Sequence, residues 1–180
     1  MASRAPLEGV KVLDFTAMLP GAICTQFLAD LGAEVIKIEP PEGEAARGPR
    51  GTPPGGIFHV TNRNKKSIAV DLKSADGVAA GRRLIAPAQV LGESFRPGGL
   101  ARLGLGWEDA RSINSALIYC SITGYGQEGP LAQKAGHDIN YQCMGGIVGQ
   151  NEIDGSRPSP GAVPVADLGG GALTSAVGIL

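Results

Sequence analysis

Two short apolar runs flank a helical pattern in residues 10–40, VKVLDFTAMLPGAICTQFLADLGAEVIKIEP. The first run covers 10–15 and leads into a turn, after which Ala22–Leu31 carries apolar residues at near-helical spacing. A glycine follows where a helix C-terminal cap belongs, and the second run, 33–38, ends at two prolines. Strand, helix and strand in this order form a βαβ unit, which predicts parallel pairing and an α/β sheet.

The same alternation continues toward the middle of the chain. We expect strands at 67–72, 88–91 and 116–122, and helices at 74–86, 100–103 and 107–113. Two stretches rich in proline and glycine, 40–57 and 149–164, are typical of long surface loops. A helix is expected to begin near residue 135 and another at 172–180. The predicted fold is therefore a Rossmann-like parallel sheet with covering helices.

The chain stops at Leu180 inside an apolar helical pattern, without a cap or a polar finish. A helix that ended there would leave its last carbonyls and its apolar face without partners. We therefore expect residues 1–180 to be the N-terminal part of a larger domain in a longer protein.

The composition excludes several classes of protein. Glycine and proline are abundant, at 28 and 13 residues, but no G-X-Y period occurs and 43% of residues are hydrophobic, which excludes collagen and disorder. Sixteen basic and 17 acidic residues give a net charge of −1, so no overall field recruits nucleic acid or an anionic membrane. An anionic ligand would need local basic groups.

The cysteines and the hydropathy pattern indicate the cellular setting. Cys24, Cys120 and Cys143 have neither disulfide-framework nor zinc-site spacing, so we expect reduced thiols and no bound metal. We find no signal sequence and no run of 18 apolar residues. A soluble, cytoplasmic protein without membrane association is the expectation.

Some candidate chemistry can be set aside from the residues alone. Glu39 ends the second strand, where a Rossmann protein places its ribose-binding acid, but the preceding turn lacks G-x-G-x-x-G, which argues against a dinucleotide. His59 lies in an apolar stretch and is interpreted as a packed or surface residue. Arg47 and Arg50 make the loop at 40–57 either a phosphate-facing flap or a solvated insertion.

Two residues remain candidates for catalysis. His137 follows a glycine in a segment rich in helix breakers, so it is either a general acid/base or an ordinary polar residue. Asp167 precedes three glycines, where backbone can approach a ligand closely. An N-cap of the following helix is an equally good interpretation of Asp167.

Several segments resemble the family III CoA-transferases of the CaiB/BaiF type, a family that also contains the α-methylacyl-CoA racemases. The similarity runs in order along nearly the whole chain, and full-length members are about twice as long as this sequence. The matching segments are VIKIEP (35–40), NRNKKS (62–67), DLKS (71–74), FRPG (95–98), RLGLG (102–106), TGYGQ (123–127), GHDINY (136–141) and Asp167 with its glycines.

The resemblance implies an acyl-CoA substrate, a Rossmann-like large domain and an interlocked homodimer. It implies that Leu72 and Lys73 line the nucleotide of CoA, while Arg96 and Arg102 meet its phosphates through paired guanidinium donors. Some racemases carry an arginine after the acid that ends the second strand. Pro40 stands there in this chain, which removes that contact.

The racemase and transferase branches differ at one position. Transferases typically carry an aromatic residue between the glycine and the aspartate of residues 136–138, whereas racemases carry the GHDINY that this chain has. The resemblance therefore implies a racemase in which His137 and Asp167 are the two bases. Asp138 and Tyr141 would orient the imidazole and the substrate, and the Asp138 N–H would help to stabilise an enolate.

The transferase remains the alternative. In that reading Asp167 attacks the thioester, giving a mixed anhydride and then an enzyme-bound CoA thioester. Racemases are expected to use a further glutamate, which would lie beyond position 180. Neither branch is expected to need a cofactor other than the coenzyme A carried by the substrate.

Overall fold

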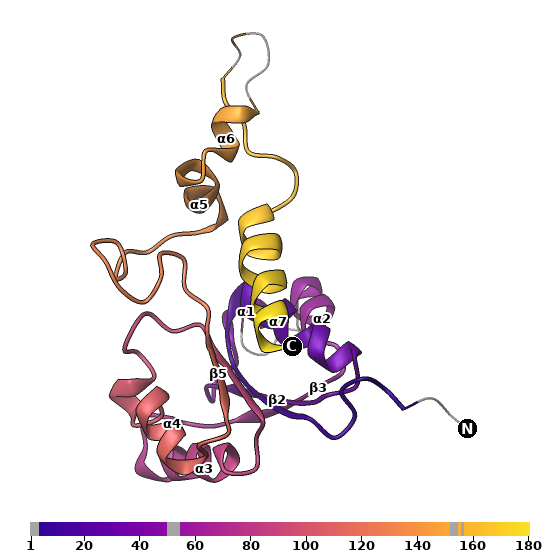
Figure 1. Ribbon diagram of the computed structural model, residues 1–180, viewed down its shortest axis with the longest axis vertical. Helices are drawn as coiled ribbons and strands as arrows, with labels where there is room; N and C mark the ends of the chain where they lie inside the picture. Colours follow the sequence, from indigo (N-terminus) through magenta and orange to yellow (C-terminus); the bar gives the residue numbers. More distant parts are fainter. Residues whose placement is uncertain (1–3, 50–54, 152–154, 156) are drawn as a thin grey trace.

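The computed structural model describes residues 4–49, 55–151, 155 and 157–180, in which five parallel strands form one sheet (Figure 1). The spatial order is β3-β2-β1-β4-β5. The strands are β1 (Lys11–Phe15), β2 (Glu34–Glu39), β3 (Lys65–Ala69), β4 (Val90–Glu93) and β5 (Ile118–Ser121). The order reverses between β1 and β4, as in a Rossmann sheet, and the expected α/β fold is confirmed.

The opening βαβ unit organises the sheet. Helix α1 (Met18–Asp30) carries the chain from β1 to β2, whose strands pair in parallel with Val12 opposite Val35. Successive residues of β1 point to opposite faces of the sheet. Leu13 and Phe15 accordingly join one buried cluster, whereas Val12 joins the other.

Helices cover both faces of the sheet. On one face, α3 (Ala75–Ile85) and α4 (Trp107–Ile113) pack with the short turn η2 (Ala101–Leu103). On the other, α1 packs beside α7 (Thr174–Ile179) and α2 (Gly56–Thr61). The Ser74 side chain caps α3 by accepting a hydrogen bond from the Gly77 N–H at 3.0 Å, as the sequence predicts.

Element boundaries differ from the sequence predictions at several places. Helix α1 begins at Met18 rather than Ala22, because a proline in the first turn costs no intrahelical hydrogen bond. Strand β3 covers Lys65–Ala69 instead of 67–72. The expected loop at 40–57 contains the short turn η1 (Ala45–Arg47) and the start of α2, and Arg50 lies outside the described residues.

After β5 the chain leaves the sheet. Figure 1 shows α5 (Asp138–Met144) and α6 (Ile147–Gln150) standing beyond the sheet, followed by the return of the chain toward α1. The return segment is η3 (Ala166–Leu173), a π-helix that continues directly into α7. The sequence predicted a helix only from 172, and a loop at 149–164 that is described only in part.

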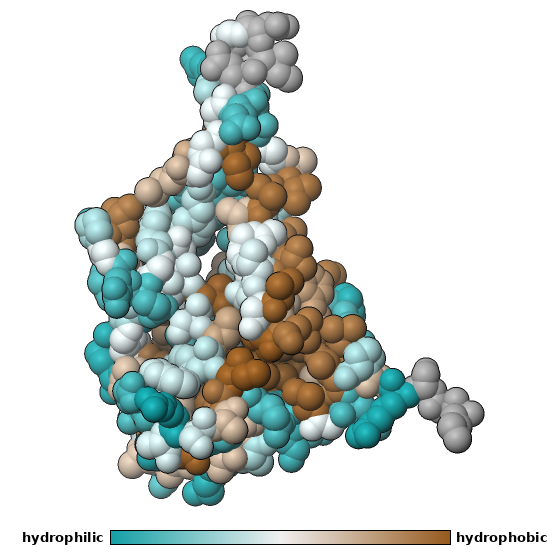
Figure 2. All heavy atoms as spheres, in the orientation of Figure 1, coloured by the Kyte–Doolittle hydropathy of each residue, from teal (hydrophilic) through white to brown (hydrophobic). Residues whose placement is uncertain are grey.

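Apolar side chains remain exposed along the rod formed by η3 and α7. Leu173, Val177 and Leu180 are each more than half exposed, and Figure 2 shows apolar atoms gathered over this side of the molecule. A contiguous apolar surface of this kind is typical of an interaction surface. Within the described part of the chain, no helix is both long and apolar enough to cross a membrane.

Candidate active site

A cavity of about 1070 Å³ opens at the carboxyl ends of the central strands. Its walls come from the β1–α1 turn, the loops after β4 and β5, the start of α5, and η3. The cavity therefore lies beside the point where the strand order reverses, between β1 and β4. Open α/β sheets bind their ligands at such a switch point.

The turn between β1 and α1 forms the floor of the cavity. The Ala17 N–H donates to Ser94 Oγ at 2.9 Å, so this turn is tied to the loop after β4. Met18 has a φ of 64°, a left-handed conformation that is uncommon for a residue other than glycine. The structure thus holds a strained turn at the place where the cavity approaches the sheet.

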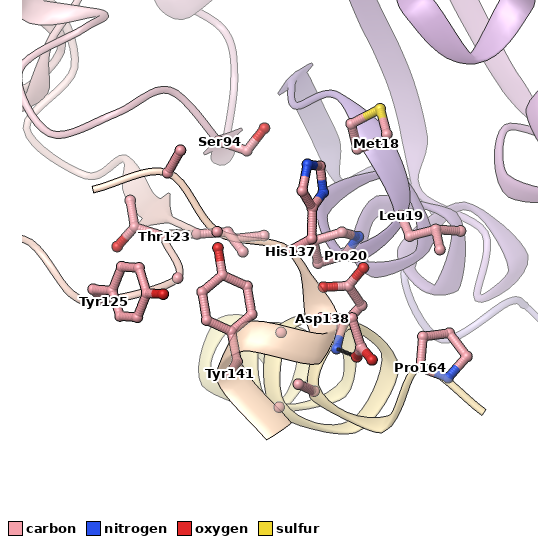
Figure 3. A pocket seen from close by; sticks show the side chains of 18 of the residues that line it. Met18, Leu19, Pro20, Ser94, Thr123, Tyr125, His137, Asp138, Tyr141 and Pro164 are labelled. Carbon is pink, nitrogen blue, oxygen red and sulfur yellow. Dashed lines mark hydrogen bonds between the residues drawn. The ribbon is translucent and has the colours of Figure 1, made fainter. Parts of the chain in front are cut away.

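His137 stands at the N-terminus of α5 and lines the cavity (Figure 3). Its backbone is extended, and its N–H donates to Asn140 Oδ1 at 2.9 Å. The Asn140 N–H in turn donates to the His137 carbonyl at 2.8 Å. These two bonds fix the backbone that carries the imidazole, whose ring is left exposed to the cavity.

Asp167 lies within the first turn of η3 and lines the same cavity. The residue at the N-cap position is Val165, so the interpretation of Asp167 as an N-cap is wrong. Asp167 instead takes part through its backbone, because its N–H donates a hydrogen bond to Asp138 Oδ1 at 2.9 Å. The other Asp138 oxygen accepts a hydrogen bond from the Gln142 amide.

Asp138 therefore links the segments that carry the two catalytic candidates. It follows His137 in the chain and binds the backbone of Asp167. Burial raises the pKa of the Asp167 carboxyl, and the negative charge of Asp138 raises it further, whereas His137 lowers it. A carboxyl with a raised pKa can carry a proton closer to neutral pH, which suits a general acid/base.

The other predicted site residues divide into two groups. Arg96 and Tyr141 line the cavity together with His137, Asp138 and Asp167. Arg96 donates from Nη1 to the carbonyl of Gln133 at 3.4 Å. The three remaining residues, Leu72, Lys73 and Arg102, do not line it.

Leu72, Lys73 and Arg102 lie beyond the cavity, in the segments after β3 and β4. Leu72 is half-buried against the cluster under α3. Lys73 is exposed, with its N–H bonded to Asp71 Oδ1 at 3.0 Å, and Arg102 is exposed on η2. The assignment of Leu72 and Lys73 to the nucleotide of CoA, and of Arg102 to its phosphates, stays a prediction.

Arg47 and Glu39, which were considered from the sequence for phosphate and ribose binding, form an ion pair with each other. Arg47 forms a two-point ion pair with Glu39, with both distances at 2.6 Å, and its guanidinium stacks 3.8 Å above the Phe58 ring. Burial alone would raise the pKa of Glu39, but hydrogen bonds from Arg47 and Ser67 lower it to about 2. The phosphate-facing interpretation of Arg47 thus loses its support.

A buried ionic cluster beneath the floor of the cavity was missed by the sequence reasoning. The Lys37 Nζ donates to the Thr16 carbonyl at 2.9 Å and lies 2.7 Å from Glu44. The Lys65 Nζ lies 3.0 Å from Asp14, which also accepts hydrogen bonds from Thr16. The available signal was a lysine within the apolar strand at 33–38. Among the residues described, no group of His, Cys, Asp and Glu side chains could hold a metal ion.

Comparison with known proteins assigns the chain to a family. The sequence model of CoA-transferase family III matches residues 7–180. A succinate–glutarate CoA-transferase of Agrobacterium fabrum is 41% identical over 175 residues, covering 92% of this chain and 44% of that protein. An α-methylacyl-CoA racemase of Mus musculus is 38% identical over 174 residues, covering 97% of this chain and 42% of that protein.

The solved structures agree with the sequence comparison. A crystal structure of a CAIB/BAIF family protein from Brucella suis superposes with a TM-score of 0.93 at 41% identity, covering 98% of this chain and 48% of that one. The chain spans about half the length of the proteins it matches. Since both the sequence model and the fold extend over nearly all of its residues, the chain belongs to CoA-transferase family III.

Proposed function

We propose that the full-length protein racemises the α-carbon of 2-methylacyl-CoA thioesters by proton transfer between two bases, His137 and Asp167. The observation that carries this proposal is that both side chains line one cavity at the sheet's switch point. The charge of His137 also acts on Asp167, since it lowers the pKa of the Asp167 carboxyl. Two bases that share a cavity can address opposite faces of one carbon.

The reaction needs one base deprotonated and the other protonated. The free base removes the α-proton, the electron pair of that C–H bond moves toward the thioester carbonyl, and an enolate forms. The protonated base then returns a proton to the opposite face, which regenerates a C–H bond of inverted configuration. The raised pKa of Asp167 supports this role, because the carboxyl can then hold the proton that it must deliver.

The rest of the proposal concerns how substrate is held. Arg96 at the cavity wall and Arg102 beyond it would meet the phosphates of CoA, and Leu72 and Lys73 would line its nucleotide. The reaction requires no cofactor besides the CoA of the substrate. An interlocked homodimer is part of the same proposal, and the exposed apolar face on η3 and α7 supports it.

A CoA-transferase is the second candidate, favoured by relatives such as the Agrobacterium fabrum enzyme, whose name states that activity. In that reaction the Asp167 carboxylate would attack the thioester carbon, and CoA would leave as the thiolate. Asp167 must be ionised both as a nucleophile and as a base, so its raised pKa does not separate the two reactions. The exposed imidazole of His137 in the same cavity supplies the second base that only the racemase needs, and this favours the racemase.

The deciding experiment incubates a 2-methylacyl-CoA with the full-length protein in deuterium oxide, without an acceptor acid, and follows the α-carbon by NMR. We expect deuterium to enter with loss of chirality. His137→Ala and Asp167→Asn should each reduce exchange by at least about 100-fold, because general acid–base groups contribute that much. His59→Ala is the control, since His59 is exposed on α2 and does not line the cavity.

Other results would favour the second candidate. Exchange that is absent without acceptor, together with CoA transfer once a carboxylic acid is added, would support the transferase. That activity should depend on Asp167 and tolerate loss of His137, and hydroxylamine should trap the acyl group on the enzyme.

A further inference from the structure

The ring of Tyr141 rests on the backbone of two glycines that are far apart in the sequence. A Cβ added to Gly136 would lie 2.7 Å from Cε1 and 2.9 Å from Cζ of Tyr141. A Cβ added to Gly124 would overlap the hydroxyl end of the same ring. Neither glycine has a positive φ, so the requirement at both positions is space and not backbone conformation.

Tyr125 completes this seat. Its ring meets Tyr141 edge-on, with centroids 5.1 Å apart and planes at 76°, and Figure 3 shows the two rings as neighbours at the cavity wall. The Tyr125 hydroxyl would also lie 2.9 Å from a Cβ added to Gly136. We call Gly124, Tyr125 and Gly136 the tyrosine seat. It joins the loop after β5 to the segment that opens α5.

The tyrosine seat bears on the placement of His137. Helix α5 stands beyond the sheet, and one anchor is the bond from the Asp167 N–H to Asp138. Tyr141 supplies a second anchor, one helical turn after His137 and toward the loop after β5. Two anchors in different directions fix both the position and the rotation of the helix start.

We propose that Tyr141, held in the tyrosine seat, is a positioning residue that sets the His137 imidazole relative to Asp167, and that Gly124 and Gly136 are glycines for this reason. The proposal rests on the proposed function in treating those two side chains as the acid–base pair. A displacement of about 1 Å at a catalytic group can cost about 100-fold in rate. A modest shift of the ring would therefore act on the chemical step.

The first test is Gly124→Ala in the full-length protein. The added methyl forces the ring off its seat, so we expect kcat for α-proton exchange to fall about 10- to 100-fold with KM changed less than about threefold. Gly149→Ala is the matched control, because Gly149 lies on the same protruding segment with open space around it. An unchanged kcat in Gly124→Ala would overturn the proposal.

A double-mutant cycle then asks whether the effect passes through the ring. Tyr141→Leu should reduce kcat as Gly124→Ala does, and adding Gly124→Ala to it should cost little more, because the clashing ring is gone. Tyr141→Phe keeps the ring, so adding Gly124→Ala to it should cost about as much kcat as in the unmodified protein. Equal losses from Gly124→Ala in the Leu and the unmodified backgrounds would contradict a positioning role.

A readout that does not depend on activity separates this proposal from the proposed function. The ring resonances of His137 in the full-length protein can be assigned as those that disappear in a His137→Gln variant. Gly124→Ala should shift the His137 resonances, whereas Gly149→Ala should leave them in place. If the unmodified protein shows no exchange, the proposed function fails, yet the resonances still decide whether the seat positions His137.

Discussion

At the scale of single residues, Asp138 affects both the position and the pKa of Asp167. Its carboxylate accepts from the Asp167 N–H at 2.9 Å, and its charge adds to burial in raising the pKa of the Asp167 carboxyl. The sequence placed Asp138 in the site as a residue that orients the imidazole. The structure adds that it binds the backbone N–H of Asp167, the other candidate for catalysis, which lies far away in the chain.

We expect Asp138→Asn to move the acidic limb of the exchange–pH profile to lower pH. Asp167 must be ionised to act as a base, and removing the neighbouring charge leaves only burial to raise its pKa. The asparagine oxygen can still accept from the Asp167 N–H. The pH dependence of kcat/KM measures the shift.

The control for this variant is Asp76→Asn, which removes an exposed charge from α3, away from the cavity. It should leave the profile unchanged. A limb that stays in place or moves to higher pH in Asp138→Asn would contradict the assigned direction.

At the scale of elements, the β1–α1 turn depends on charges buried beneath it. Lys37 is fully buried on β2, and it reaches the Thr16 carbonyl, Glu44 and, at 3.8 Å, Asp14. Burying such groups is tolerable only when they compensate one another. Because Lys37 donates to the Thr16 carbonyl, the buried cluster holds the turn at the cavity floor in one conformation.

We expect Lys37→Met to lower the free energy of unfolding by about 3–5 kcal/mol, because Asp14 and Glu44 would lose a buried cationic partner. Urea denaturation measures the change. Lys66→Met is the matched control on the neighbouring strand, since Lys66 is exposed and pairs with Glu34 at the surface. Lys66→Met should lower the free energy of unfolding by only about 0–1 kcal/mol. Equal losses in the two variants would contradict the role of the buried cluster.

At the scale of the whole molecule, the return of the chain after α6 brings the candidate site together. The rod formed by η3 and α7 packs against α1 on one face of the sheet. A Cβ added to Gly171 would lie 2.7 Å from Cβ of Pro20, so the two elements approach closely beside the cavity. This approach places Asp167 across from residues of the β1–α1 turn.

We expect Gly171→Ala to be less stable than Gly178→Ala by about 1–3 kcal/mol. Both substitutions replace a helical glycine, so the gain in helix propensity largely cancels between them. Only Gly171 meets a rigid neighbour, whereas Gly178 faces open space, and overpacking of this kind costs that amount. Thermal denaturation of the two variants compares them, and equal stability would contradict the close packing.

The sequence by itself determined the order of elements and the two catalytic candidates. Apolar periodicity and caps such as Ser74 act between residues close in the chain, so they predicted the βαβ unit, α3 and α4 well. His137 and Asp167 could be singled out because His137 follows a glycine and Asp167 shortly precedes three glycines.

Only the tertiary structure decided how those residues meet. The N-cap reading of Asp167 failed because a carboxylate from α5, remote in sequence, binds its N–H and the helix begins before it. Arg47 was left open as a phosphate ligand until its pairing with Glu39 was seen. Hydrogen bonds, ion pairs and ring contacts between distant segments depend on how the chain folds back on itself. The local periodicity of a sequence does not show which distant segments will come into contact.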